Sequence, residues 1–269
     1  MENKMNDAAR RYVVVTGATG GVGYATALRL ARKGYDVIGQ YGTRDDTALE
    51  LQTEIANVGM AATVVQADLT EPAGQTHLVA AVESALSDSP KSRLAGLVNS
   101  AAKLVGPSFD DATIDQFDSY FALNARAPFF LTQRLSKFMG PGSSIVNVSS
   151  VATRFSSSGD IVYAMSKAAL EALTFHAAEA LAARGIRINT VMPGFTDNGH
   201  PAFKDAAVRA YMSSFSALGG VADPADVADA IAFLMSDSAS RTTGTLFDVS
   251  GGSALGRRPA GGSLEDFLG

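Results

Sequence analysis

Short runs of β-branched and other apolar residues alternate along the chain with longer stretches in which apolar residues recur every three or four positions. The short runs predict buried strands, and the recurrence every three or four positions predicts amphipathic helices. Strands are predicted at residues 12–16, 37–40, 62–66, 94–99, 144–149, 187–191 and 245–249. Helices are predicted at residues 22–33, 46–58, from Pro72 onward, 113–139, 161–184 and 226–235.

This regular alternation has a consequence for the topology. Right-handed crossovers between successive strands place helices on both faces of a parallel sheet. The first run, Tyr12-Val13-Val14-Val15, is apolar at every position, as expected for a strand that is buried on both faces. We therefore predict an α/β fold with one doubly wound parallel sheet, and ligands of such sheets bind at the carboxyl ends of the strands.

No internal repeat or interdomain linker interrupts the alternation, which indicates a single domain over residues 11–255. Residues 1–10 are predicted to form a flexible N-terminal segment. Residues 256–269, which contain Gly, Arg and Pro, are predicted to form a loosely held C-terminal tail. The helix at 113–139 should be interrupted near Asn124 and Pro128, because proline lacks the N–H that continues a helix.

Composition excludes several classes of function. The 269 residues include no cysteine, which removes disulfides, thiolate metal sites and a cysteine nucleophile. The three histidines (His77, His176 and His200) lie far apart, so no metal site is expected. A net charge of −5 argues against nucleic acid as a partner. No apolar run reaches the roughly 18 residues of a membrane span, and the absence of a signal-peptide pattern leads us to expect a cytoplasmic protein.

A glycine-rich turn joins the first predicted strand to the first predicted helix, and it reads Thr16-Gly17-Ala18-Thr19-Gly20-Gly21-Val22-Gly23. Glycine lets the backbone approach a pyrophosphate closely, and the free N–H groups of a helix N-terminus favour its negative charge. The turn therefore predicts a dinucleotide site. The alternative is a turn that is merely rich in glycine.

The spacing of this turn resembles TGxxxGxG, the cofactor turn of the short-chain dehydrogenase/reductase family. The resemblance covers residues 11–252, and it implies a Rossmann-type fold and hydride transfer between a nicotinamide cofactor and a carbonyl or secondary alcohol. The other matching motifs are Asn99-Ser100-Ala101-Ala102 in the place of the family's NNAG, Asn124, Ser150 followed 13 positions later by the YxxxK-like Tyr163-Ala164-Met165-Ser166-Lys167, Pro193-Gly194, and a closing segment from Gly244 to Gly252. Within the first of these motifs, Ser100 and Ala102 depart from NNAG, but neither change removes a catalytic group.

Tyr163 and Lys167 are four residues apart and therefore share one face of a helix. A neighbouring ammonium is expected to lower the pKa of Tyr163, so that the phenol can give a proton to a carbonyl oxygen. Ser150 would hydrogen-bond the same oxygen, and the 13-residue spacing favours Ser150 over Ser149 for this role. The family resemblance further implies that Lys167 binds the nicotinamide ribose and that Asn124 anchors a water in a proton relay.

The choice of cofactor depends on the end of the second predicted strand. An acidic residue there would bind the ribose 2′-hydroxyl of NAD, but Tyr41 holds that position. Thr43 and Arg44 follow and are suited to a 2′-phosphate, which favours NADPH and leaves NADH possible. Arg44 as a solvated loop charge is the alternative. The cofactor-binding residues that the resemblance implies are Gly17, Thr19, Gly21, Val22, Gly23, Tyr41, Thr43, Arg44, Asp68, Leu69, Asn99, Ala101, Tyr163, Lys167, Pro193, Gly194 and Thr196.

Residues 196–218 occupy the position of the family's variable substrate loop. Apolar side chains in and near this loop suggest a pocket for a small hydrophobic or aromatic ketone, and packing within a lid is an equal alternative. Family members are commonly tetramers, so a homo-oligomer, tetramer or dimer, is expected. Two other functions stay open, an NAD-linked alcohol dehydrogenase and a non-catalytic nucleotide-sensing protein. The apolar side chains in question are Phe155, Phe195, Phe203, Tyr211, Met212 and Phe215.

Overall fold

The computed structural model describes residues 10–255 except 88, 157 and 200. Apart from residue 10, the two predicted terminal segments lie outside the described residues, and so does His200. Seven parallel strands form one sheet in the order β3-β2-β1-β4-β5-β6-β7. The predicted α/β fold is therefore confirmed. The strands are β1 (Arg11–Thr16), β2 (Asp36–Tyr41), β3 (Ala62–Gln66), β4 (Arg93–Asn99), β5 (Ser144–Val148), β6 (Arg187–Pro193) and β7 (Leu246–Val249).

The helices agree with the predicted pattern, and most predicted ends lie within two residues of those observed. The α-helices are α1 (Gly21–Arg32), α2 (Asp45–Asn57), α3 (Pro72–Ser87), α4 (Ile114–Phe121), α5 (Ala127–Leu135), α6 (Ile161–Ala182), α7 (Ala206–Ser213) and α8 (Pro224–Met235). Short 3₁₀ turns occupy Ser136–Phe138, Val151–Thr153, Ser158–Asp160, Pro201–Lys204, Asp237–Ala239 and Ser253–Leu255.

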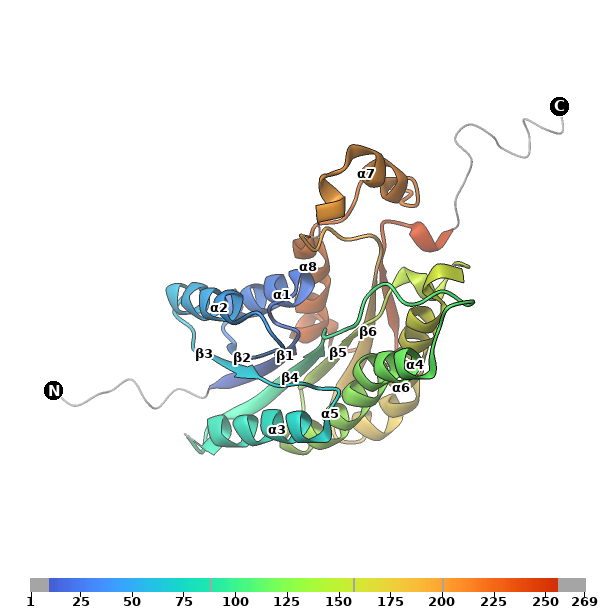
Figure 1. Cartoon of the computed structure of the whole chain (residues 1–269). Helices are drawn as coiled ribbons and strands as arrows, with labels where there is room; N and C mark the ends of the chain where they lie inside the picture. Colours follow the sequence, from blue (N-terminus) through green and yellow to red (C-terminus); the bar gives the residue numbers. More distant parts are fainter. Residues whose placement is uncertain (1–9, 88, 157, 200, 256–269) are drawn as a thin grey trace, which may run out of the picture.

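The sheet is covered on both faces, with α1, α2 and α8 on one side and α3, α5 and α6 on the other (Figure 1). Successive residues of a strand point to opposite faces, and β1 shows this directly. Val13 and Val15 belong to the core beneath α1 and α8, whereas Tyr12 and Val14 belong to the core on the α3 and α5 side. Two apolar cores explain why the whole first strand is apolar.

The predicted interruption of the long helix is confirmed as a π-helical segment, Ala122–Arg126, between α4 and α5. The N–H of Ala127 bonds to the carbonyl of Ala122, five residues back. Pro128 has no N–H to offer to the carbonyl of residue 124, so regular α-helical bonding fails at this place. The interruption places Asn124 at an irregular turn that faces α6.

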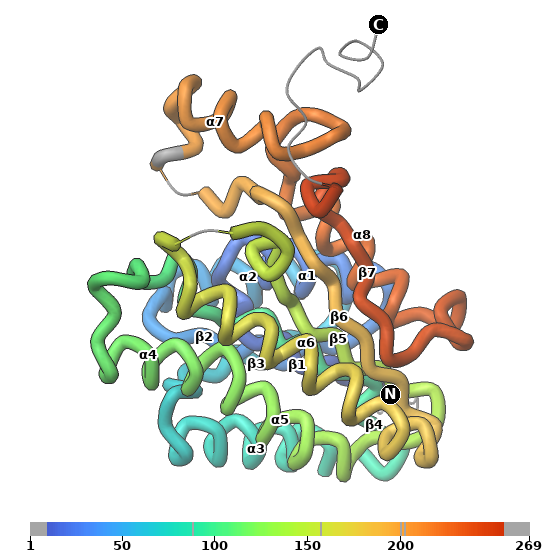
Figure 2. The backbone as a smooth tube through the Cα atoms, turned by 90° about the vertical axis from the view of Figure 1, so that its right-hand side faces the viewer, coloured from blue at the N-terminus to red at the C-terminus, as the bar shows by residue number. Residues whose placement is uncertain are grey.

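The segment between β6 and α8 leaves the layered body. It contains the 3₁₀ turn Pro201–Lys204 and α7, and it stands beyond the carboxyl end of β6 in both views (Figures 1 and 2). A parallel bridge between Thr196 and Ala222 closes its base. Within the part of the chain that the structure describes, no helix is long and apolar enough to cross a membrane.

Candidate active site

The strand order reverses between β1 and β4, and the turns that follow these two strands pack against each other. Gly17 has φ +65°, and a Cβ at this position would lie 2.8 Å from the Cα and 2.9 Å from the nitrogen of Ala101. Only glycine combines this backbone angle with such close approach. In a doubly wound sheet, the reversal point is where a dinucleotide binds.

Two buried polar side chains hold the glycine turn in place. Thr16 accepts hydrogen bonds from the backbone N–H groups of Ser100 (3.0 Å) and Ala101 (3.1 Å). Gln40 accepts from the N–H of Gly17 (3.0 Å) and donates to the carbonyl of Ala67 (2.7 Å). We did not single out Gln40 from the sequence. The sequence feature that could have identified Gln40 is a long polar side chain at the end of the apolar run predicted as the second strand.

The N-terminus of α1 is suited to an anion. Its N-cap residue Gly20 supplies no side-chain acceptor, and the first turn contains no acidic residue. By contrast, α4, α7 and α8 are capped by Thr113, Asp205 and Asp223. The uncapped N–H groups of α1 and its helix dipole therefore favour a bound phosphate.

Arg44 lies beside this helix end. One of its guanidinium nitrogens is 3.6 Å from the point that a Cβ on Gly20 would occupy. A hollow of about 480 Å³ opens there, and among the described residues that line it Arg44 is the only basic one. Thr43 is exposed beside Arg44, and Tyr41 at the end of β2 is partly exposed. The lining residues are Thr19, Gly20, Gly21, Tyr24, Ala25, Arg44, Thr47, Glu50, Glu54, Asn198, Asp223 and Pro224.

The side chains of some predicted cofactor residues are already engaged within the protein. The side chain of Leu69 is buried in the core, and the side chain of Asn99 donates to the Asn147 amide oxygen (2.8 Å). Asp68 accepts hydrogen bonds from the N–H (2.8 Å) and hydroxyl (2.7 Å) of Thr70. After β6, Gly194 lies so close to β7 that a Cβ would be 2.8 Å from the carbonyl oxygen of Ser250.

The predicted catalytic residues meet where β5 ends against α6. The Ser150 side chain lies near the Tyr163 phenol, and Lys167 follows one turn later with its Nζ 5.9 Å from the centre of the Tyr163 ring. Nζ of Lys167 donates to the carbonyl of Val148 (2.7 Å). Ser149 instead donates to Glu171 (2.6 Å). The geometry thus brings Ser150, and not Ser149, to the phenol.

The expected lowering of the Tyr163 pKa by Lys167 is wrong for this structure. Burial raises the pKa of Tyr163 above its usual value, with Asp160 and Tyr120 adding to the rise and only the Ser150 hydrogen bond opposing it. The ammonium of Lys167 is directed at a backbone carbonyl and is itself desolvated. Burial lowers the pKa of Lys167 to about 8, and the charge of Glu171 opposes that fall.

Asn124 is fully buried, and its amide connects two parts of the site. Its oxygen accepts from the N–H of Lys103 (2.9 Å), and its nitrogen donates to the carbonyl of Lys103 and to the hydroxyl of Ser166 (both 3.0 Å). Ser166 in turn donates to the carbonyl of Tyr163 (2.7 Å). Because both amide N–H groups are used, a water held by Asn124 would have to donate to one of its oxygens.

The loop after β4 presses directly on Tyr163. A Cβ on Gly106 would lie 2.8 Å from the nitrogen and 3.0 Å from the Cβ of Tyr163. Val105 beside it has φ +52°, a strained angle for a β-branched residue, and is exposed. The hydroxyl of Tyr120 donates to the carbonyls of Leu104 and Val105 and supports the loop.

Aromatic rings gather near α7. The ring of Phe215 lies 5.7 Å from Phe155, 5.3 Å from Phe195 and 5.2 Å from Tyr211, centroid to centroid. These residues come from the loop that follows Ser150, the end of β6 and the predicted substrate loop. The cluster therefore joins the predicted loop to the catalytic side of the sheet.

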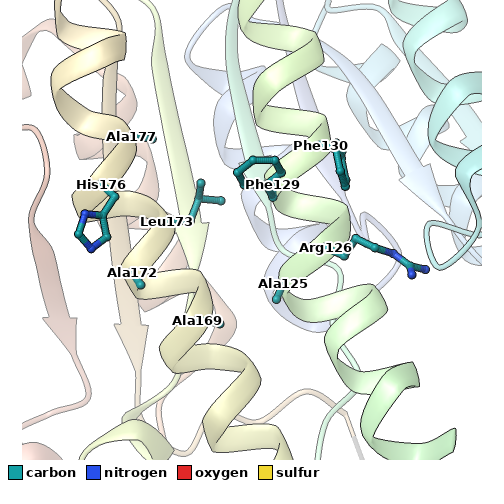
Figure 3. A pocket seen from close by; sticks show the side chains of 9 residues that line it. All are labelled: Ala125, Arg126, Phe129, Phe130, Ala169, Ala172, Leu173, His176 and Ala177. Carbon is teal, nitrogen blue, oxygen red and sulfur yellow. The ribbon is translucent and has the colours of Figure 1, made fainter.

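A separate apolar groove of about 550 Å³ lies between α5 and α6 (Figure 3). Phe129 and Phe130 face it from α5, and Leu173 and His176 face it from α6, with alanines between them. The two phenylalanines are 45% and 41% exposed, which is unusual for such large apolar side chains. Ser150, Tyr163 and Lys167 do not line this groove.

Known proteins are similar to this chain over most of its length. The model of a family described as enoyl-(acyl carrier protein) reductase matches residues 17–254. The short-chain dehydrogenase/reductase FrzI of Cladobotryum sp is 35% identical over 247 residues, which cover 89% of this chain and 94% of that protein.

Two solved structures are similar over nearly the whole fold. The angucycline C-6 ketoreductase LanV with bound NADP has a TM-score of 0.88 and 39% identity, covering 91% of this chain and 96% of that one. LugOII, a promiscuous reductase that catalyses keto-reduction at C1 during lugdunomycin biosynthesis, has the same TM-score and identity, covering 91% and 98%.

Proposed function

The chain belongs to the short-chain dehydrogenase/reductase family of oxidoreductases, and we propose that it is an NADPH-dependent reductase of apolar ketones. The observation that carries this proposal is that Ser150 lies near the Tyr163 phenol, one helical turn from the buried ammonium of Lys167. A hydroxyl donor, a second hydroxyl and a fixed cation are the groups that carbonyl protonation needs.

The residues present fit a dinucleotide. The uncapped N-terminus of α1 and the close glycine turn suit the pyrophosphate, and Arg44 beside Gly20 suits an additional 2′-phosphate. NADP bound to LanV supports the same choice. We assign the binding contacts to the residues predicted above, with Leu69 and Asn99 contributing backbone atoms.

When bound, the nicotinamide supplies the hydride. Tyr163 then gives its proton to the carbonyl oxygen, and Ser150 donates a hydrogen bond to the same oxygen as negative charge grows. The ammonium of Lys167 lies beside the Tyr163 ring and is held there by the Val148 carbonyl. Asn124 holds the loop after β4 against α6 and so keeps the phenol in position.

The aromatic cluster supports an apolar, ring-containing substrate. Phe155, Phe195 and Phe215 provide aromatic faces on the side of α7, and a flat ketone would pack on such faces. The ketoreduction attributed to LanV and LugOII agrees with a ketone as the reacting group.

The experiment that tests the function follows NADPH absorbance with a panel of aromatic and aliphatic ketones and aldehydes. We expect turnover, with aromatic ketones reduced faster than aliphatic ones. Faster oxidation of alcohols with NAD would support the NAD-linked dehydrogenase instead. Tight cofactor binding without any turnover would support a nucleotide-sensing protein.

Replacing Arg44 with alanine is expected to reduce the preference for NADPH over NADH by about tenfold, because a charge-assisted hydrogen bond to phosphate contributes about 1.5–3 kcal/mol. Titration of each cofactor by its own fluorescence measures this. Arg32→Ala, at the opposite end of α1, is the control and should leave both affinities unchanged. Equal affinities of the wild-type protein for the two cofactors would contradict the NADPH preference.

We further propose that the groove between α5 and α6 is covered by a second copy of the chain in a homo-oligomer. Its exposed phenylalanines and small alanines allow close helix packing. Light scattering should give a mass of two or four times 27.9 kDa. Leu173→Glu should lower that mass, because a carboxylate would be buried without a partner. A wild-type mass of a single chain would contradict this proposal.

A further inference from the structure

We propose that Glu171 is a positioning residue that fixes Ser150 for catalysis, an inference that rests on the proposed function. The sequence alone did not single out this residue. Its carboxylate lies on α6, one turn beyond Lys167 and on the same side of the helix.

The carboxylate binds the chain on both sides of Ser150. Oε1 of Glu171 accepts hydrogen bonds from the hydroxyls of Ser149 (2.6 Å) and Thr153 (2.8 Å). Oε2 forms an ion pair with Arg154 at 2.6 Å. The side chain of Glu171 is only 14% exposed, so these bonds are largely shielded from water. Hydrogen bonds to a shielded carboxylate are among the stronger ones in proteins.

Lys167 adds a contact just before these residues. Its Nζ donates to the carbonyl of Val148, the last residue of β5. The segment from residue 148 to residue 154 is therefore attached to α6 by Lys167 at its start and by Glu171 further along. Ser150 lies between these attachments, so its backbone cannot shift toward or away from Tyr163 without breaking at least one of them.

The charge of Glu171 also raises the pKa of Lys167. The ionisable groups facing the ammonium on its own helix are Tyr163 and Glu171, whereas β5 contributes only the Val148 carbonyl. In the turn after β5, Arg154 binds the second oxygen of Glu171. Without the Glu171 carboxylate, the pKa of the desolvated Lys167 would fall further, and the ammonium would lose its proton more easily.

Three variants separate position from charge. Glu171→Gln keeps an acceptor oxygen but loses the charge, Glu171→Asp keeps the charge but shortens the reach, and Glu171→Leu removes both. Glu179→Gln is the matched control, because Glu179 is exposed near the end of the same helix. Each variant is assayed for kcat, KM for the ketone, NADPH affinity and the pH dependence of kcat.

We expect kcat to fall about tenfold in Glu171→Gln and about a hundredfold in Glu171→Leu, as a small misplacement of catalytic groups can cost this much. KM and NADPH affinity should change by less than about threefold. The alkaline limb of the kcat profile should move to lower pH in Glu171→Gln, because Lys167 then loses its proton more easily, and should stay in place in Glu171→Asp.

Hydrogen–deuterium exchange provides a measurement that needs no turnover. Exchange at residues 149–154 should be faster in Glu171→Leu than in the wild-type protein, while the control leaves it unchanged. If the wild-type protein has no ketoreductase activity, the proposed function is wrong. The exchange rates at residues 149–154 would still show whether Glu171 holds this segment in place. Unchanged exchange, or wild-type kcat and pH profile in Glu171→Gln, would overturn the inference.

Discussion

Tyr163→Phe is expected to lower kcat for ketone reduction by about 10²–10⁴-fold, the contribution typical of general acid catalysis. The variant lacks the phenol hydroxyl near Ser150, which is the proposed proton donor. Affinity for NADPH should change by less than about threefold. NADPH absorbance measures turnover, and cofactor fluorescence measures binding.

Tyr35→Phe is the control for this result. Its hydroxyl bonds to the backbone carbonyl of Met235 (3.3 Å), on the face of the sheet covered by α1 and α8. It should keep wild-type turnover. If Tyr163→Phe retains more than a tenth of the wild-type kcat, another group supplies the proton and the proposed role of Tyr163 is wrong.

Gly23→Ala is expected to destabilise the fold by about 2–3 kcal/mol, in the range of overpacked cores. A Cβ at this buried position would collide with the Gly17 carbonyl oxygen and lie 2.8 Å from its carbon. The gain in helix propensity from Gly to Ala is only about 1 kcal/mol, so the collision dominates. Because the glycine turn must shift, NADPH affinity should fall by more than tenfold.

Urea unfolding measures the stability and NADPH fluorescence measures the affinity. Gly140→Ala is a suitable comparison, because a Cβ there meets nothing within 4 Å. It should change the free energy of unfolding by less than about 0.5 kcal/mol. Unchanged cofactor affinity in Gly23→Ala would mean that the turn does not bind the phosphates.

The fold was largely predictable because its signals are local. Apolar runs and periodic helices follow from which face each residue must bury, and β1 meets both cores as the run Tyr12-Val13-Val14-Val15 predicts. The helix interruption near Asn124 was also predictable, since it depends on the missing N–H of Pro128.

The candidate site was predictable only as a set of residues. The 13-residue spacing favoured Ser150 over Ser149, and the structure gives the physical difference, since Ser149 is bound to Glu171 whereas Ser150 lies near Tyr163. The direction of the Tyr163 pKa shift was predicted wrongly. Helical spacing placed Lys167 nearby, but spacing carries no information about burial or about the Val148 carbonyl that receives the ammonium.

By itself, the sequence determined the strands, the helices, the parallel sheet and the end of the sheet where the motifs gather, because these follow from local periodicity and chain connectivity. Only the tertiary structure decided which side chains support the site. Gln40 supports the glycine turn through hydrogen bonds to Gly17 and Ala67, and Glu171 bonds to Ser149, next to Ser150. In each of these pairs the two residues are 22 or more positions apart in the sequence. Contacts of that kind, and the desolvation that sets the pKa of Tyr163 and Lys167, exist only once the chain is packed.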